Sequence, residues 1–250
     1  MAKNRIENQL RNSLGERELR LFEVFEKYEQ GQMSLTAELA TGLKMPSLTL
    51  MAFACLGSKR GCEEIIANIN NTILFSRFRK RLQRIVEDLQ IIEPATTMII
   101  FLPDLEPKRT WGWKKDQAEI TLACMIMQEE AELPANWEVR LWSEVDDNCQ
   151  PGYEEALARV EKYTRPQILE EETRFFRELA TKHPDILTHG RPHELAQRQL
   201  TAYAHEGRAL ERLYPRGILL QTDVPIDRRD AMFAPLRREP LAIIHPFARD

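Results

Sequence analysis

Two candidate nucleophiles stand in a short turn that follows a continuous apolar run. Residues 47–55 read Ser-Leu-Thr-Leu-Met-Ala-Phe-Ala-Cys, and residues 55–61 then hold a thiol, a hydroxyl, two glycines and two cations. Such a run is typical of a buried strand, and ligands of open α/β sheets bind outside the carboxyl ends of such strands. Cys55 and Ser58 are therefore candidate nucleophiles, and Gly57 is a candidate substrate-binding position.

Both nucleophile candidates also have an ordinary structural interpretation. A free cysteine that ends an apolar run is most often a small buried hydrophobe. A serine in a turn before a helix is often the N-cap, although a hydroxyl there also lies near helix amides that can hold an oxyanion. The sequence leaves the choice between Ser58 and Cys55 open.

A second group of reactive side chains is Tyr203, His205 and Glu206. Tyr203 and Glu206 are three residues apart, so they share a face if this segment is helical. A tyrosine and a carboxylate so placed can position a substrate amine and relay its proton. The alternative is a core tyrosine beside a solvated glutamate.

An acidic residue follows the second predicted strand. Residues 96–102 read Thr-Thr-Met-Ile-Ile-Phe-Leu, and Pro103 and Asp104 come next. Since this position again lies beyond the carboxyl end of a strand, Asp104 is a candidate substrate-binding residue.

Two groups of cations are candidate nucleic-acid contacts. Five lie within eight residues, opposite the apolar face of a predicted helix: Arg77, Arg79, Lys80, Arg81 and Arg84. Four more surround Trp111 and Trp113: Lys108, Arg109, Lys114 and Lys115. Cations among indoles suit phosphate contact with base stacking. The alternatives are a solvated helix face and a surface loop anchored by two aromatic side chains.

The apolar periodicity predicts the elements that position these groups. Strands and helices alternate, which favours a mainly parallel sheet with helices on both faces. We expect an N-terminal helical extension, residues 1–46, packed on a single domain, residues 47–250. Strands are predicted at 47–55, 96–102, 139–142, 217–220 and 241–244, and helices at about 16–30, 63–92, 115–131, 153–182 with a break at Pro166, and 193–213.

Composition narrows the class of protein. The chain has 250 residues, 43% of them hydrophobic, and a net charge of −4, so nucleic-acid binding would need a local basic patch. The four cysteines match no zinc pattern, and His183, His189 and His193 do not form a ligand set, so we expect no metal. Phosphate-binding glycine motifs are also missing from the sequence. Without an apolar leader or spanning segment, we expect a cytoplasmic protein with no membrane contact.

The order of these parts resembles the tRNA-dependent cyclodipeptide synthases over roughly residues 47–247. The shared features are a first strand ending in a small-residue turn, a strand ending in Pro103-Asp104, residues 139–142 leading to Tyr153, a helix with Tyr203 and Glu206, and a final strand ending at His245. The chain departs from the family's Gly-x-Ser-x-x-Asn turn, and its Tyr–Glu spacing is three rather than four. Such departures resemble a divergent branch, such as the fungal arginine-using synthases.

The resemblance implies a Rossmann-like fold related to the catalytic domains of class I aminoacyl-tRNA synthetases. It implies that two aminoacyl-tRNAs supply the amino acids of a cyclic dipeptide, a secondary metabolite, with no ATP, metal or other cofactor. Ser58 or Cys55 would carry the first aminoacyl group, Tyr203 and Glu206 would hold the amino group, and His245 would assist proton transfer. Both groups of cations would bind tRNA phosphates.

Two other functions remain open from the sequence. One is a non-catalytic RNA-binding α/β module, and the other is a nucleotide-dependent α/β transferase with an unfamiliar phosphate loop. The amino acids joined and the oligomeric state are not fixed by these residues.

Overall fold

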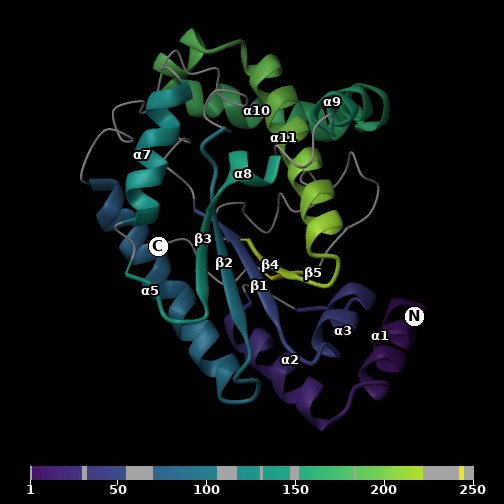
Figure 1. Ribbon diagram of the computed structural model, residues 1–250. Coiled ribbons are helices and arrows are strands. Elements are labelled where there is room, and N and C mark those ends of the chain that lie inside the picture. The colour runs from purple at the N-terminus through teal and green to yellow at the C-terminus, as the bar shows by residue number, and fades with distance from the viewer. Residues whose placement is uncertain are drawn as a thin grey trace.

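The computed structural model has a parallel sheet between two layers of helices (Figure 1). It describes residues 2–29, 33–54, 70–105, 117–129, 132–146, 152–182, 184–221 and 242–244. The strands within these ranges are β1 (Thr49–Phe53), β2 (Thr97–Leu102), β3 (Trp137–Leu141), β4 (Ile218–Leu220) and β5 (Ala242–Ile244). Every pairing between them is parallel, so the predicted Rossmann-like α/β fold class is confirmed.

The strand order β3-β2-β1-β4-β5 identifies where a ligand of this fold binds. The chain proceeds outward from β1 through β2 to β3, and then returns to place β4 on the opposite side of β1. The order therefore reverses between β1 and β4, and ligands of open parallel sheets bind at the carboxyl end of such a switch point. The predicted turn after β1 begins at this point in the sequence.

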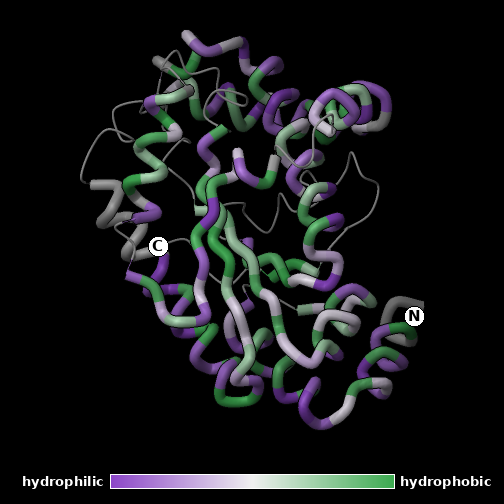
Figure 2. The backbone as a smooth tube through the Cα atoms, in the orientation of Figure 1, coloured by the Kyte–Doolittle hydropathy of each residue, from purple (hydrophilic) through white to green (hydrophobic). Residues whose placement is uncertain are grey.

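The described helices flank the strands on both faces, and most agree with the sequence prediction. Figure 2 shows hydrophobic and hydrophilic residues alternating along them, as expected for amphipathic helices. They are α1 (Ala2–Asn12), α2 (Glu16–Tyr28), α3 (Ala37–Leu43), α5 (Asn70–Gln90), α7 (Gln117–Glu129), α8 (Trp142–Asp146), α9 (Gly152–Tyr163), α10 (Pro166–Lys182), the 3-10 helix η2 (Pro184–Thr188) and α11 (Pro192–Leu213). The predicted break at Pro166 is confirmed, because α9 ends at Tyr163 and Pro166 begins α10.

Alternate residues of β1 face the two helical layers. Leu50 and Ala52 belong to a buried cluster that also contains Leu82 of α5. Met51 and Phe53 belong to a second cluster with residues of α11. This period of two is the geometry of a strand that is buried on both faces. The second cluster connects α11 with the end of β1.

The N-terminal helices share the first cluster rather than standing apart. Leu21, Phe22 and Phe25 of α2 and Leu43 of α3 are buried with residues of β1 and β2. The hydrophobic effect therefore holds residues of the predicted extension against the sheet.

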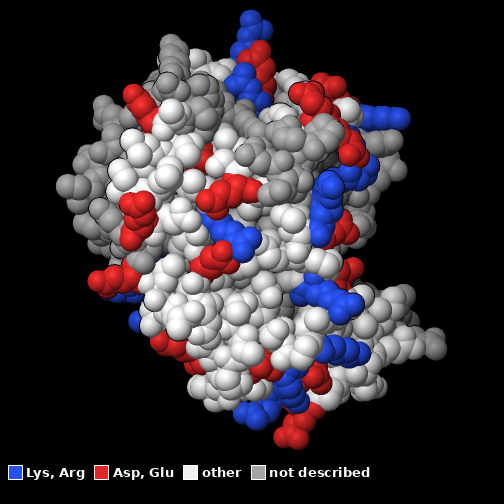
Figure 3. Space-filling view, in the orientation of Figure 1, with Lys and Arg blue, Asp and Glu red and all other residues white. Residues whose placement is uncertain are grey.

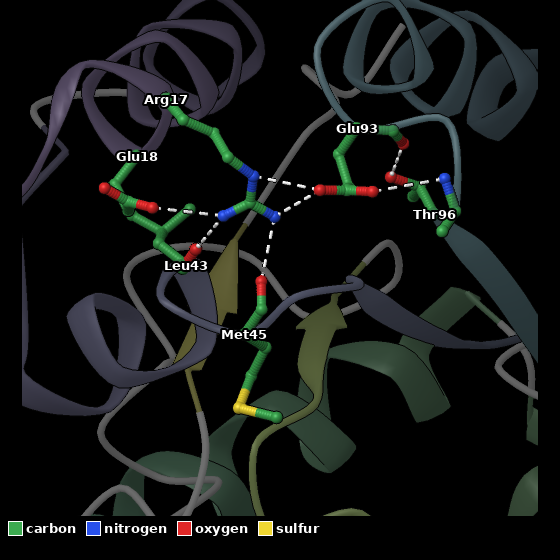
Figure 4. Close-up of polar contacts among 7 residues, drawn as sticks. Arg17, Glu18, Leu43, Met45, Glu93 and Thr96 are labelled. Carbon is green, nitrogen blue, oxygen red and sulfur yellow. Dashed lines mark hydrogen bonds and ion pairs between the residues drawn. The ribbon is translucent and has the colours of Figure 1, made fainter.

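Arg17 adds a polar attachment at the amino end of the sheet (Figure 4). Its guanidinium donates to the carbonyls of Leu43 and Met45 at 2.9 and 2.8 Å, and two of its nitrogens donate to Glu93 at 2.9 and 2.5 Å. Glu93 precedes β2, and its carbonyl accepts from the N–H of Thr96 at 3.0 Å. A forked guanidinium suits this task because it donates in several fixed directions. Arg17 thus connects α2, the end of α3 and the entrance to β2.

Candidate functional site

Asp104 lies buried just beyond β2 and connects three elements. Its Oδ1 accepts from the backbone N–H of Ser143 in α8 at 2.9 Å, and its Oδ2 accepts from the Thr121 hydroxyl in α7 at 3.1 Å. Its side chain is inaccessible to solvent, with 0% exposure. The first-turn amides of a helix lack partners within the helix, so a carboxylate here fixes the start of α8. The substrate-binding role of Asp104 stays a prediction. Its hydrogen bonds hold the start of α8 and Thr121 of α7 at the carboxyl end of β2.

Cys124 is a buried thiol of α7 that belongs to the same cluster as Leu82 of α5. Burial, and then the negative charge of Asp104, raise the pKa of the Cys124 thiol to about 12. Since the thiolate is the nucleophilic form of cysteine, Cys124 is inert near neutral pH.

Trp142 carries an aromatic ring to the carboxyl edge of β1 and β2. The sequence predicted that Trp142 would end a strand, but the strand ends at Leu141 and Trp142 begins α8. The prediction was wrong because an apolar side chain fits either element, whereas the hydrogen bond from Ser143 to Asp104 favours the helix. The Trp142 ring lies 5.0 Å from that of Phe53 and 5.5 Å from that of Phe101, edge-on to both.

The indole N–H of Trp142 is the unusual polar group of this edge. Trp142 has 0% exposure, and its Nε1 has no hydrogen-bond acceptor among the residues that the structure describes. A buried donor without a partner costs about 1–3 kcal/mol. Sequence reasoning gave this residue no role, because the lack of an acceptor depends on tertiary packing.

Tyr203, His205 and Glu206 all lie on α11, as predicted, and all are buried. Tyr203 is 6% exposed and Glu206 is 7% exposed, so the alternative of a solvated glutamate is wrong. Tyr203 belongs to the apolar cluster that contains Phe53 and Trp142. A buried carboxyl group is rare unless polar groups surround it, and it is a common feature of functional sites.

His205 connects α11 with α8 and α9. Its ring centroid is 6.3 Å from that of Trp142 and 5.8 Å from that of Tyr153. A Cβ atom at Gly152 would lie 3.3 Å from the His205 ring, so the glycine allows α9 to begin close to α11. Glu206 is the next residue of α11 after His205 and is also buried.

The predicted basic face is present on the described part of α5. Lys80, Arg81 and Arg84 are exposed, whereas Leu82 and Ile85 are buried in the core. Arg79 is half-buried. Arg77 also lies in α5, and its side chain is not among those that the structure describes. On the face shown in Figure 3, positive and negative side chains are interspersed among the described residues. The tRNA-binding role of these cations stays a prediction.

Several predicted site residues lie outside the described ranges. In sequence, residues 55–58 come directly after Ala54, and residue 245 comes directly after β5. The residues concerned are Cys55, Gly57, Ser58, Lys108, Arg109, Lys114, Lys115 and His245.

The comparisons with known proteins identify no relative of this chain. No family model matches the chain, and no curated protein or solved structure matches it either.

Within the described ranges, no group of three or more histidine, cysteine, aspartate or glutamate side chains is arranged to hold a metal ion. The helices that the structure describes include none that is both long and apolar enough to span a bilayer.

Proposed function

We propose that the chain is an aminoacyltransferase that makes a cyclic dipeptide from two aminoacyl-tRNAs. The observation that carries the proposal is the burial of Tyr203 and Glu206 on α11, whose Tyr203 packs with residues of β1. The candidate nucleophiles come directly after that strand in sequence. The strand order, with its reversal between β1 and β4, supports a ligand site at this edge.

The reaction proceeds through a covalent intermediate at Ser58 or Cys55. The side-chain oxygen or sulfur attacks the carbonyl carbon of the first aminoacyl ester, and the bond to the tRNA ribose oxygen breaks. That oxygen leaves with the proton that the nucleophile loses, so charge is conserved. Dividing peptide formation in this way replaces one difficult step with two easier ones.

Two further acyl transfers complete the product. The amine of the second aminoacyl-tRNA attacks the enzyme-bound carbonyl, which forms the peptide bond and frees the nucleophile. The amine of the first residue then attacks the remaining ester, closing the ring and releasing the second tRNA. Glu206 and Tyr203 hold and deprotonate the attacking amine, and His245 assists the proton transfer in cyclisation. ATP and metal are not needed, because the tRNA ester is already activated.

Expression in a bacterium with mass spectrometry of the culture extract tests this function. A new cyclic dipeptide, absent with the Glu206→Gln variant, is the expected result. Failure to find it in a culture that contains the folded protein and charged host tRNAs would contradict the proposal.

A second candidate is an RNA-binding module without catalysis. The exposed cations Lys80, Arg81 and Arg84 on one helix favour it. A binder would retain its RNA affinity when Ser58 and Cys55 are replaced by Ala. Neither its wild-type form nor this variant would make a cyclic dipeptide. Turnover that depends on ATP would identify the nucleotide-dependent transferase instead.

A further inference from the structure

We propose that the indole N–H of Trp142 donates a hydrogen bond to a carbonyl or carboxylate oxygen of the bound ligand. The proposal rests on the proposed function for the identity of that ligand, an aminoacyl ester. It deepens that function by assigning a recognition group that the family resemblance did not include.

The first argument is that this donor stands out from satisfied neighbours. The Leu141 N–H donates to Glu144 Oε2 at 3.3 Å, and the Ser143 N–H donates to Asp104 Oδ1 at 2.9 Å. The backbone on both sides of Trp142 is therefore fixed, while its indole Nε1 has no acceptor within the described part of the chain. Native proteins leave few buried polar groups without partners, and such a group calls for an explanation.

The second argument is position. Phe53 and Phe101, which the Trp142 ring contacts, are paired across β1 and β2 at the carboxyl end of the sheet. The ring also contacts His205, which precedes the buried Glu206. The Trp142 ring thus contacts both the ends of the central strands and the helix that carries the predicted amine-binding residues. Ligands of parallel α/β sheets bind at this edge.

The third argument is chemistry. An indole donates one hydrogen bond and accepts none, so its partner must be an acceptor such as a carbonyl or carboxylate oxygen. The Phe53 and Phe101 rings that contact Trp142 make its surroundings apolar, which suits an acyl group with an apolar portion beside its oxygen. An amino acid linked through an ester has both features, because its acyl oxygen adjoins its side chain. A donor already held in place costs little ordering when the ligand binds.

Nuclear magnetic resonance of the four indole groups tests the proposal. The probes are 3′-amino-3′-deoxyadenosines that carry an amide-linked arginine, leucine or phenylalanine, with the unacylated nucleoside as the matched control. We expect an acylated probe to move the Trp142 indole proton downfield and the control to leave it in place. Single Phe variants of the other three tryptophans assign the signal by elimination, so wild-type protein gives the result even if Trp142→Phe does not fold.

Affinity gives a second measurement. Loss of one neutral hydrogen bond predicts roughly fivefold weaker binding of the acylated probe to Trp142→Phe. Trp137→Phe, at the opposite end of β3, is the matched control and retains wild-type affinity. Binding without movement of the Trp142 signal, equal affinity in both variants, or failure of every acylated probe to bind would overturn the proposal.

The same preparations separate this inference from the proposed function. Cyclic dipeptide formation with an unmoved Trp142 signal would contradict the hydrogen bond alone. A moved signal with no product from aminoacyl-tRNAs would contradict the transferase reaction while supporting the hydrogen bond.

Discussion

The Asp104 carboxylate accepts the backbone N–H of Ser143 at 2.9 Å and thereby joins the end of β2 to the start of α8. The same carboxylate accepts the Thr121 hydroxyl of α7 at 3.1 Å. Because Trp142 stands between β3 and Ser143, this hydrogen bond also constrains the backbone that carries its ring.

Replacing Asp104 tests the strength of this junction. Asp104→Ala removes the buried acceptor of the half-buried Ser143 N–H and Thr121 hydroxyl, so we expect it to lower the free energy of unfolding by about 2–3 kcal/mol. Asp104→Asn is expected to cost less than about 1 kcal/mol, because its oxygen still accepts from Ser143 and its amide can donate to the Thr121 hydroxyl. Urea unfolding measures both variants, and equal losses of stability would contradict the account.

The hydrogen bonds of the Asp88 carboxylate predict a contribution to stability that is lost in acid. A hydrogen bond from Lys27, then one from Tyr28, lower the pKa of the Asp88 carboxyl below its usual value. The unfolded chain therefore binds a proton at higher pH than the folded protein does. The stabilisation is present above the unfolded pKa and is lost as pH falls through the folded pKa.

Urea unfolding from about pH 5 to pH 2 measures this contribution. Wild type should lose more stability over that range than Asp88→Asn. Glu87→Gln removes the same charge one residue earlier and is the control for net charge. Parallel curves for wild type and Asp88→Asn would show that Asp88 is not linked to folding.

The burial of Cys124 predicts that its thiol is protected from alkylation in the folded protein. Its raised pKa, about 12, means that the folded protein holds the neutral thiol well above neutral pH. The stabilisation from this neutral thiol is complete below the unfolded pKa and is lost as pH rises toward the folded pKa. Maleimide at about pH 8 should label Cys124 only after urea is added, as seen by peptide mass spectrometry. Rapid labelling of the native protein at this residue would be inconsistent with its environment.

The exposed cations of α5 predict salt-dependent RNA binding. Changing Lys80 and Arg84 to Gln should weaken tRNA binding and reduce the slope of log affinity against log salt by about 1 for each phosphate that is no longer neutralised. Arg174→Gln on α10, also exposed, is the control for the loss of one positive charge away from this face, and each single variant of Lys80 and Arg84 is compared with it. Filter binding over a range of salt concentrations measures the slope, and an unchanged slope in the double variant would exclude this face as a phosphate-binding surface.

Local patterns predicted the fold well because its elements have strong signatures. The apolar runs before Cys55 and Pro103 became β1 and β2, and Pro166 separates α9 from α10 as its missing N–H requires. The periodicity of residues 193–213 predicted α11 to within one residue at its start. Such signals depend on neighbours in the sequence, so one sequence is sufficient to read them.

The site was less accessible to prediction because it depends on packing between distant segments. The burial of Glu206, and the lack of an acceptor for the Trp142 indole among the described residues, both depend on packing between elements that are distant in sequence. The hydrogen bonds from Thr121 and Ser143 to Asp104 span 17 and 39 residues. Spacing along the chain carries no signal for contacts of that kind.

Intact-protein mass spectrometry after brief exposure to aminoacyl-tRNA tests the central claim most directly. Without added ATP, the account predicts that the mass of the wild-type protein increases by one aminoacyl group. One of the two variants Ser58→Ala and Cys55→Ala, the one that lacks the nucleophile, should not show this increase. A second aminoacyl-tRNA should discharge that group as a cyclic dipeptide. An unmodified protein that leaves its aminoacyl-tRNAs intact would contradict the proposed reaction.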